Sequence, residues 1–377
     1  MGMGGAQKQV LNLITSDELR AYRHSILCII AYKGEFLQPA LDLGIPVEFC
    51  PIRWPARTIF PSYRINRWLR DKLQVTFPWR LARALKQLDA TLVHTYVTTS
   101  MYWQAKAVLQ LAKLPWIWTI CGLYKTRGEN VEQWPSALRL ITKHDKARIT
   151  GVSHAALREV EEYGIVQPHK LSVIYNGIHT DHFRKAPHLR LDWRKQWGIP
   201  ENAVVFGTAG RLIDVKRHDL TIRAFSKLAA RQENIHFVLA GVGPLRHKLE
   251  QLVQAFGLQG RFHLVGFQQD MNKYLNAIDV FILASDSESF ANVLVEASAL
   301  SVPCIATAVG GIPEVIGDAG VLIPPDSDEA LASAMTAMLS AAEREKYASK
   351  SVDVVSRFSL TQCARQYEAL YHDLLSP

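Results

Sequence analysis

The sequence lacks the marks of a secreted disulfide protein, a structural zinc protein and an integral membrane protein. Its 377 residues include five scattered cysteines, none of which forms the C-x-x-C pair typical of a zinc site or a redox motif. No apolar run approaches the roughly 18 residues that span a bilayer, and the N-terminus carries no signal-peptide pattern. No carboxylate cluster with D-x-D spacing stands out as a magnesium site. We therefore expect a cytoplasmic protein with no integral membrane segment and no bound metal.

The first half of the chain is also short of acidic residues. Residues 1–175 contain 23 Lys and Arg against 13 Asp and Glu, a charge of +10, whereas residues 176–377 contain 20 against 22, a charge of −2. Much of the excess lies between Arg53 and Lys86, where nine basic and six aromatic residues accompany one acidic residue, Asp71. This mixture predicts docking to an anionic membrane surface or to an acidic or phosphate-bearing acceptor. The alternative is a solvated helical face with aromatics turned to the core; nucleic-acid binding is not predicted, because no recognition motif accompanies the charge.

Strand-like apolar segments alternate with segments of helical period along most of the chain. The strand-like segments are residues 26–31, 47–52, 91–96, 116–121, 148–152, 171–175, 203–208, 236–240, 261–265, 280–284 and 302–307. This βα alternation predicts parallel sheets covered by helices on both faces. A bend at Asn176 and Gly177 marks a linker, so we expect domains at residues 1–178 and 179–357 and a final helical segment at 358–377.

The most informative stretch runs from Ser285 to Leu300, where a buried strand is followed by a polar turn and a helix. Glu288 in the turn and Glu296 in the helix are separated by about two helical turns, a rise of roughly 12 Å. A glycosidase pair needs its carboxyls about 5 to 10 Å apart, and a metal would need both on one ion. The two carboxylates are therefore expected to contact two different parts of one elongated ligand. Backbone N–H groups around residues 290–293 favour an anion between the carboxylates, such as a diphosphate with a hydroxylated group at each end.

The stretch resembles the Glu-x7-Glu motif of family 4 of the retaining glycosyltransferases. Further matching segments are G-G-A-Q at Gly4–Gln7, V-H-T-Y at Val93–Tyr96, V-I-Y-N-G-I at Val173–Ile178, G-R-L-I-D-V-K at Gly210–Lys216, G-V-G-P-L at Gly241–Leu245 and G-G-I-P-E at Gly310–Glu314. The resemblance implies an α/β fold of GT-B architecture, with two Rossmann-like doubly wound domains facing a cleft. It also implies that the C-terminal helix crosses back onto the first domain.

Donor-side roles are assigned from both the residues and the resemblance. Arg211 and Lys216 follow a strand, where two fixed cations would neutralise a departing diphosphate without a metal or cofactor. The resemblance implies that Glu296 holds the ribose hydroxyls and Glu288 contacts the transferred sugar. It also implies a substrate-binding set made of Gly210, Gly266, Phe267 and the backbone of Phe290, Ala291, Asn292 and Val293. Relatives usually have Gly-Phe-Pro where this chain has Ser289, Phe290 and Ala291, a change expected to alter donor choice.

The acceptor side departs further from the family pattern. His94 is the candidate catalytic histidine or, alternatively, a packed core histidine, and Tyr96 stands where relatives often have a second histidine near the reacting sugar. Cys121 likewise replaces a frequent histidine. Gly4 and Gly5 belong to a loop that approaches the sugar phosphates in the family. A buried strand precedes that loop in relatives, so we expect the first strand to be missing here or the start codon to be misplaced, at a cost in unpaired sheet groups.

These patterns predict a retaining hexosyl- or N-acetylhexosaminyl-transferase. The donor is a nucleotide-diphosphate sugar, most plausibly a UDP-sugar, and the acceptor is a saccharide or a lipid-linked glycan. The setting is polysaccharide, lipopolysaccharide or other cell-envelope synthesis at the cytoplasmic membrane face. Two alternatives stay open: a catalytically impaired sugar-nucleotide-binding protein, and a GT-B epimerase or phosphorylase.

Overall fold

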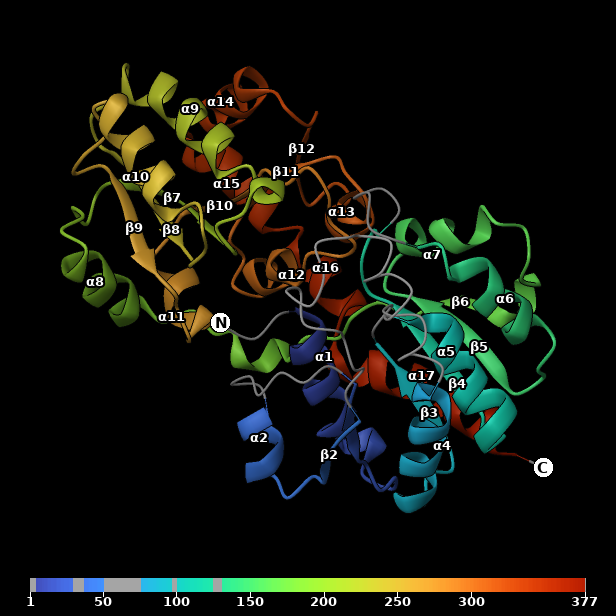
Figure 1. The fold of residues 1–377 in the computed structure, drawn as a ribbon. Helices are drawn as coiled ribbons and strands as arrows, with labels where there is room; N and C mark the ends of the chain where they lie inside the picture. The colour runs from blue at the N-terminus through green and yellow to red at the C-terminus, as the bar shows by residue number, and fades with distance from the viewer. Residues whose placement is uncertain (1–4, 30–36, 51–75, 97–99, 125–130, 377) are drawn as a thin grey trace. The chain divides into compact units, whose positions relative to one another are not determined.

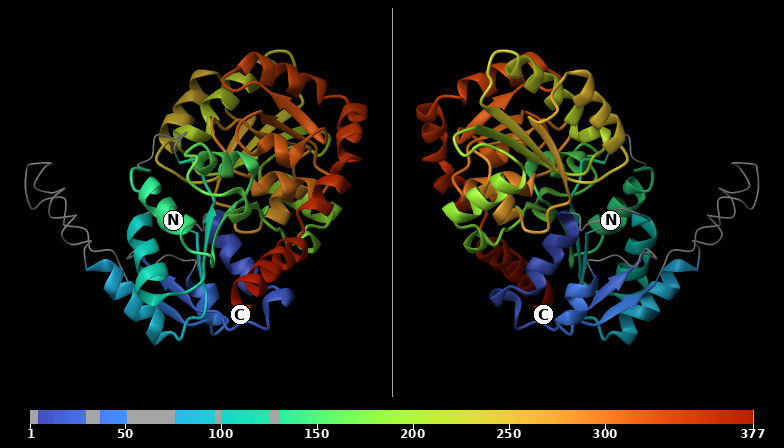
Figure 2. Two further views of the ribbon diagram at one scale, coloured as in Figure 1. Left: turned by 90° about the vertical axis from the view of Figure 1, so that its right-hand side faces the viewer. Right: turned by 90° about the vertical axis from the view of Figure 1, so that its left-hand side faces the viewer.

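The computed structural model describes residues 5–29, 37–50, 76–96, 100–124 and 131–376. The contacts between residues divide the chain into two compact units. The first unit comprises Met1–Gly177 and Thr361–Pro377, and the second comprises Ile178–Leu360. Each unit is built from strands covered by helices (Figures 1 and 2), which is a layered α/β architecture.

The first unit carries short parallel strands and the C-terminal helix. Its described helices are α1 (Gly5–Ile14), η1 (Asp17–Leu19), α2 (Leu37–Asp42), α4 (Phe77–Gln87), α5 (Met101–Ala105), η2 (Lys106–Ala112), α6 (Trp134–Thr142), α7 (His154–Glu161), η3 (Pro168–Lys170) and α17 (Leu360–Leu375). Its described strands are β1 (Ile26–Cys28), β2 (Val47–Phe49), β3 (Val93–Thr95), β4 (Trp116–Ile120), β5 (Ala147–Gly151) and β6 (Leu171–Val173).

These strands form two separate parallel sheets within the described residues. One has the order β3-β4-β5-β6 and the other pairs β1 with β2. All five residues of β4, Trp-Ile-Trp-Thr-Ile, are buried, as expected for a parallel strand covered on both faces. In register, Trp118 lies beside Thr95 of β3 and Ile149 of β5. The core of this unit is therefore centred on β4.

The second unit contains a larger set of elements. They are η4 (Thr180–His182), α8 (Pro187–Gln196), β7 (Val204–Ala209), η5 (Asp214–Lys216), α9 (His218–Ala229), β8 (Ile235–Ala240), α10 (Arg246–Ala255), β9 (Phe262–Gly266), α11 (Met271–Asn276), β10 (Val280–Leu283), α12 (Asn292–Ala299), β11 (Cys304–Thr307), α13 (Ile312–Ile316), β12 (Gly320–Ile323), α14 (Asp328–Ala337), α15 (Ala341–Ala348) and α16 (Ser351–Arg357).

The strands of the second unit that the structure describes form one parallel sheet in the order β12-β11-β10-β7-β8-β9. Every residue of β8 and of β10 is buried, so the sheet is covered on both faces. Side-chain caps help to fix where helices start: Asp270 accepts from the N–H of Lys273 at 3.1 Å and Ser327 accepts from the N–H of Ala330 at 3.1 Å. The order reverses direction between β10 and β7, and ligands of such sheets bind at the carboxyl ends of strands around the reversal.

The predicted α/β fold with parallel sheets is confirmed, and each predicted strand that the structure describes is present, most of them shorter than predicted. Strand β12 was not predicted from the sequence, because a four-residue apolar run that starts with glycine shows little strand periodicity.

Helix α17 joins the end of the second unit to the first, as the fold prediction required. From Thr361 onward it belongs to the first unit. The hydroxyl of Tyr371 lies 2.7 Å from Nδ1 of His94, and Arg148 forms a 3.0 Å ion pair with Asp373. Gln9 of α1 also donates to Sγ of Cys363 at 3.4 Å. These contacts attach α17 to α1, β3 and β5.

Candidate functional site

In the second unit, three glycines lie at the carboxyl ends of neighbouring strands. The N–H of Gly210, after β7, donates to the carbonyl of Ala240 at 3.0 Å, and the N–H of Gly241, after β8, donates to the carbonyl of Gly266 at 2.7 Å. A Cβ on Gly241 would lie 1.9 Å from the carbonyl oxygen of Gly210, so no larger residue fits there without a backbone shift. Close packing of strand ends therefore explains the glycine at position 241.

The predicted charged residues Lys216 and Glu288 lie together at this edge of the sheet. Nζ of Lys216, in η5, forms an ion pair with Oε1 of Glu288, which follows β10. Ser285, fully buried at the end of β10, donates from Oγ to the same carboxylate oxygen at 2.8 Å. The backbone carbonyl of Glu288 also accepts from the N–H of Gly311 at 2.9 Å. Glu288 is thus held from three directions, and its carboxylate neutralises Lys216.

Arg217, the neighbour of Lys216, is a residue that the sequence interpretation missed. Its guanidinium forms ion pairs with Asp219 at 3.4 Å, Asp286 at 2.9 Å and Asp326 at 2.5 Å. Its backbone is left-handed, with φ of 48°, immediately before α9. The three carboxylates belong to three different segments, so Arg217 ties together the loops around Lys216 and Glu288. The signal available in the sequence was the pair of adjacent bases, Lys216 and Arg217.

The entry to α12 has an unusual backbone. Ala291, immediately before the helix, has φ of 67°, a left-handed conformation that L-residues other than glycine adopt at a cost. Proline fixes φ near −65° and cannot take this conformation. Proline at position 291, the residue that the family resemblance places there, would therefore require a different loop conformation.

The remaining donor-side predictions fall on α12 and on the adjacent strand ends. Glu296 is 4% exposed within α12, and the ring of Phe290 packs edge-on against Phe358 with centroids 5.2 Å apart. The ring of Phe290 is therefore engaged in packing, and its predicted backbone contact with a ligand stays a prediction. At the end of β9, the ring of Phe267 is 55% exposed. Arg211 is exposed, whereas the half-buried residues Asn292 and Val293 open α12.

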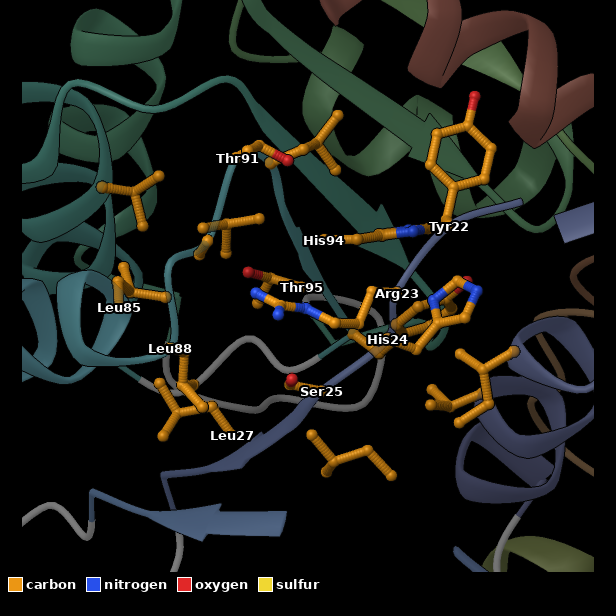
Figure 3. A pocket seen from close by; sticks show the side chains of 18 of the residues that line it. Tyr22, Arg23, His24, Ser25, Leu27, Leu85, Leu88, Thr91, His94 and Thr95 are labelled. Atoms are coloured by element: carbon orange, nitrogen blue, oxygen red, sulfur yellow. The ribbon is translucent and has the colours of Figure 1, made fainter. Parts of the chain in front are cut away.

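In the first unit, His94 has both ring nitrogens engaged. Nδ1 lies 2.7 Å from the hydroxyl of Tyr371 and Nε2 lies 2.7 Å from Oγ1 of Thr119 (Figure 3 shows the imidazole from the pocket side). Burial lowers the pKa of His94 to about 3, so the ring is neutral at pH 7. A neutral imidazole with two protein partners is typical of a positioning residue. The catalytic assignment of His94 stays a prediction.

Tyr96 and Cys121 lie beside His94. The rings of Tyr96 and His94 have centroids 4.4 Å apart, and Sγ of Cys121 donates to the carbonyl of Tyr96 at 3.1 Å. Burial raises the pKa of both side chains, so neither ionises near neutral pH. Gly5 is the exposed first residue of α1, and Gly4 lies outside the described residues.

The basic and aromatic segment from Arg53 to Lys86 is described only from residue 76 onward. In α4, Arg83 and Lys86 are exposed, and Trp79 is 52% exposed with the ammonium of Lys106 5.6 Å from its ring centroid. The described end of the segment therefore does present charge and one large aromatic ring to solvent.

Two absences in the part of the chain that the structure describes concern metals and membranes. No group of three or more His, Cys, Asp or Glu side chains is arranged to hold a metal ion within them. Among the helices of this same described part, none combines the length and the apolar character that crossing a bilayer requires.

Comparisons with known proteins bear on the family of this chain. The family model described as Glycosyltransferase Family 4 matches residues 3–182, and the model described as Glycosyl transferases group 1 matches residues 190–352. N-acetyl-alpha-D-glucosaminyl L-malate synthase of Bacillus anthracis is 32% identical over 232 residues, which cover 60% of this chain and 60% of that protein. The GPI3 subunit of phosphatidylinositol N-acetylglucosaminyltransferase from Saccharomyces cerevisiae is 26% identical over 83% of this chain and 67% of its own length. This chain therefore spans about two thirds or less of these curated relatives.

Solved structures extend the likeness over the whole chain. HepE of Anabaena, solved with UDP-glucose, matches with a TM-score of 0.81 and 20% identity, covering 99% of this chain and 97% of HepE. WaaG, a glycosyltransferase of lipopolysaccharide biosynthesis, matches with a TM-score of 0.70 and 16% identity, covering 98% and 96%. These neighbours confirm the predicted fold class, and the two family models cover nearly all of the sequence. The chain belongs to glycosyltransferase family 4, the glycosyl transferases group 1, and has the GT-B fold.

Proposed function

We propose that this protein is a retaining glycosyltransferase that moves a hexosyl or N-acetylhexosaminyl group from a UDP-sugar to a saccharide or lipid-linked acceptor. The observation that carries the proposal is the pairing of Lys216 with Glu288 at the carboxyl edge of the second sheet. Both side chains are mostly buried, with 20% and 14% exposed, and α12 with Glu296 follows directly. A diphosphate sugar offers partners for each of these three groups.

The pair suggests how a donor would be gripped without a metal. Lys216 is neutralised by Glu288 in the protein alone, so a diphosphate must compete with the carboxylate for the ammonium. Once the ammonium turns to phosphate, Glu288 becomes free to accept hydrogen bonds from sugar hydroxyls. The charge that develops on the leaving diphosphate is then stabilised by a preorganised cation. Glu296 accepts the ribose hydroxyls in this scheme.

The relatives support the choice of donor and of pathway. HepE was solved with UDP-glucose, and the malate synthase and the GPI3 subunit are named for N-acetylglucosaminyl chemistry. WaaG is described as acting in lipopolysaccharide biosynthesis, and WclY of Escherichia coli, 25% identical over 214 residues, in O-antigen biosynthesis. We therefore propose that the protein acts in polysaccharide or cell-envelope glycan assembly in the cytoplasm.

A second candidate function is binding of a sugar nucleotide without transfer. The arrangement of His94 favours it, because both ring nitrogens are held by Tyr371 and Thr119 and the ring is neutral. Tyr96 and Cys121 bring no group that ionises near neutral pH. Retaining transfer remains chemically feasible with a neutral His94 if the leaving phosphate itself accepts the proton of the acceptor hydroxyl.

The test is a thermal-shift screen with UDP-, GDP- and ADP-sugars, followed by mass spectrometry of donor hydrolysis and of transfer to candidate acceptors. A donor at 100 times its Kd stabilises the fold by roughly 2.7 kcal/mol. Stabilisation by a UDP-sugar with release of UDP supports the transferase. Stabilisation with no turnover in the presence of acceptors supports the binding protein. No stabilisation by any of the three donors contradicts both proposals.

We also propose peripheral attachment to the inner face of the cytoplasmic membrane through the segment from Arg53 to Lys86. Replacing Arg64, Arg67 and Arg70 by Gln should abolish sedimentation with vesicles of anionic lipid, since each basic residue near such a surface contributes about 1 kcal/mol. A matched control replaces three exposed bases of the second unit, Lys195, Arg231 and Lys248. Equal loss in the control, or no vesicle binding by the unmodified protein, would contradict membrane docking.

A further inference from the structure

The loop between β10 and α12 is anchored by a single large apolar side chain. Between Ser285 and Asn292 the sequence is otherwise made of small or polar residues, and Phe290 is its one bulky apolar residue. The ring of Phe290 is 1% exposed and meets the ring of Phe358 edge-on, with the planes at 85°. Edge-on aromatic pairs are favourable beyond the area that they bury. The position of Phe290 in the loop therefore depends on Phe358.

Phe358, at the end of α16, is itself held by its ring and by its backbone. Cζ of Arg357 lies 4.8 Å from the centroid of the Phe358 ring, so this ring contacts both a guanidinium and Phe290. The backbone carbonyl of Phe358 accepts from the N–H of Ile178 at 3.0 Å, and the N–H of Leu360 donates to the carbonyl of Ile178 at 2.9 Å. These bonds pair the end of α16 with the first residue of the second unit. Phe358 is therefore a fixed support.

Arg357 connects Phe358 to α13, and α13 contacts the same loop. Nη2 of Arg357 donates to the carbonyl of Val315 at 2.8 Å, near the end of α13. Before the start of this helix, the N–H of Gly311 donates to the carbonyl of Glu288 at 2.9 Å. Figure 1 shows α12 beside α13 and α16. The loop is thus held at Glu288 by α13 and two residues later by Phe358, and Arg357 links the two supports.

The residue that follows Phe290 has a backbone that depends on such support. Ala291 has φ of 67°, and left-handed residues other than glycine persist where surrounding contacts fix them. The N–H of Leu294 donates to the carbonyl of Ala291 at 3.0 Å, so α12 starts from this strained residue. A shift of Phe290 would therefore move both Ala291 and the first turn of α12.

We propose that Phe358 is a positioning residue for donor binding. Its ring fixes Phe290, and thereby the loop and the first turn of α12, whose backbone N–H groups are to meet the diphosphate. This inference rests on the proposed function, since it places a nucleotide-diphosphate sugar at Glu288 and α12. Arg357 acts on the same loop through Phe358 and α13. A looser loop adopts the binding geometry for a smaller fraction of the time, and the apparent affinity for the donor falls by that fraction.

The alternative is that Phe358 contributes only to the core of the second unit. Loss of core packing lowers the melting temperature and leaves the folded site as it was, whereas loss of positioning also changes the site in the folded protein. Phe225 of α9 offers a matched control, because its fully buried ring packs against Phe237 and Phe262. No donor role is assigned to these three rings.

The first measurement is amide hydrogen exchange of the full chain without ligand. In Phe358→Leu, exchange at Gly311 and Leu294, whose N–H groups donate to carbonyls of the loop, should rise by roughly 2- to 10-fold, the range expected for one edge-on aromatic pair. The amide of Leu249, which is bonded within α10, should keep its rate. No acceleration in Phe358→Leu, or equal acceleration of both loop amides in Phe225→Leu, would overturn the proposal.

The second measurement is titration with UDP. The Kd for UDP should rise by roughly 2- to 10-fold in Phe358→Leu and stay unchanged in Phe225→Leu. In a transfer assay the KM for the donor should rise by the same factor while the KM for the acceptor does not change. Faster exchange with an unchanged Kd for UDP would overturn the proposal. Failure of UDP to bind the unmodified protein would contradict the proposed function, whereas exchange without ligand tests the role of Phe358 in the loop independently.

Arg357→Gln tests the same support if Phe358→Leu does not fold. Arg357 is exposed, so its replacement leaves the core intact while it removes the guanidinium from the Phe358 ring and the hydrogen bond to α13. Exchange at Gly311 and Leu294 should again rise. The control is Arg344→Gln, which removes an arginine that donates to the carbonyls at the end of α14 and in the turn after it, at 2.7 and 2.9 Å. Equal exchange in the two arginine variants would contradict the link through α13.

Discussion

The two units share one βα pattern and differ in how completely their sheets are assembled. In the second unit, the described strands pair in one unbroken sheet, with Phe237 stacked on Phe262 at 4.6 Å in its core. In the first, the described strands form separate sheets, and a cavity of about 800 Å³ is lined by the edges of β1 and β3. Apolar strands at the right spacing are therefore not sufficient for a closed core; each edge also needs a neighbour.

Their polar sites differ as well. The second unit gathers full charges, with Lys216 on Glu288 and Arg217 on three aspartates. The first unit gathers neutral groups, in which Thr119 joins His94 to Thr150 at 2.7 Å and to Tyr367 at 3.2 Å. Charges suit the grip on a diphosphate, whereas neutral hydroxyls and an imidazole suit hydrogen bonds to a sugar or to α17.

The largest expected effect contrasts the two cores. Phe237→Ala should destabilise the second unit by about 3–5 kcal/mol, because a fully buried ring is lost and a cavity is left. Leu27→Ala should cost only about 1 kcal/mol, since its side chain already borders a cavity and little new void is made. Calorimetry with hydrogen exchange assigned to each unit measures both. Equal costs would show that the first core is as tightly packed as the second.

The next effect tests the charged site. Lys216→Gln should lower kcat by about 100- to 1,000-fold, the usual result of removing one preorganised electrostatic partner. The melting temperature should also fall, because the carboxylate of Glu288, 14% exposed, loses the cation that balances its charge. Lys227→Gln, an exposed lysine on α9 whose partners are Asp328 and Glu329, is the control and should keep full activity. A Lys216 variant with unchanged kcat would remove this lysine from the mechanism.

A third effect concerns pH. Burial lowers the pKa of His218 to about 4, below the value of 6.5 for the unfolded chain. Its contribution to stability is therefore present above pH 6.5 and is lost as pH falls from 6.5 toward 4. Between pH 7 and pH 5 the His218→Gln variant should therefore lose about 2 kcal/mol less unfolding free energy than the unmodified protein. Urea unfolding at the two pH values measures it, with the exposed His247→Gln as control. An unchanged pH dependence would mean that His218 is protonated in the folded protein.

The smallest effect concerns the start of α12. Ala291→Gly should stabilise the second unit by about 1 kcal/mol, because glycine adopts the left-handed backbone of this position without strain. Ala291→Pro, which restores the common family residue, should force the loop to rearrange and change donor affinity. Thermal unfolding of both variants measures the change in stability, and titration with UDP measures the change in donor affinity. Destabilisation by glycine would contradict the left-handed conformation.

The sequence predicted more of the second unit than of the first. Continuous apolar runs such as Val280–Leu283 identify buried strands. The spacing of Glu288 and Glu296 then indicated where a donor would bind. Arg217 escaped notice because its three partners are distant in sequence and only folding brings them together. The same holds for Tyr371, whose contact with His94 spans 277 positions.

What the sequence determined by itself is local: the order of strands and helices, the uneven charge and the residues available for chemistry. These follow from periodicity and composition, which act over a few neighbouring positions. The tertiary structure decided which strand edges pair, that the ring nitrogens of His94 are occupied, and that Ala291 adopts φ of 67°. Those features depend on contacts between segments far apart in the chain, and a local pattern carries no information about the partner that each group meets.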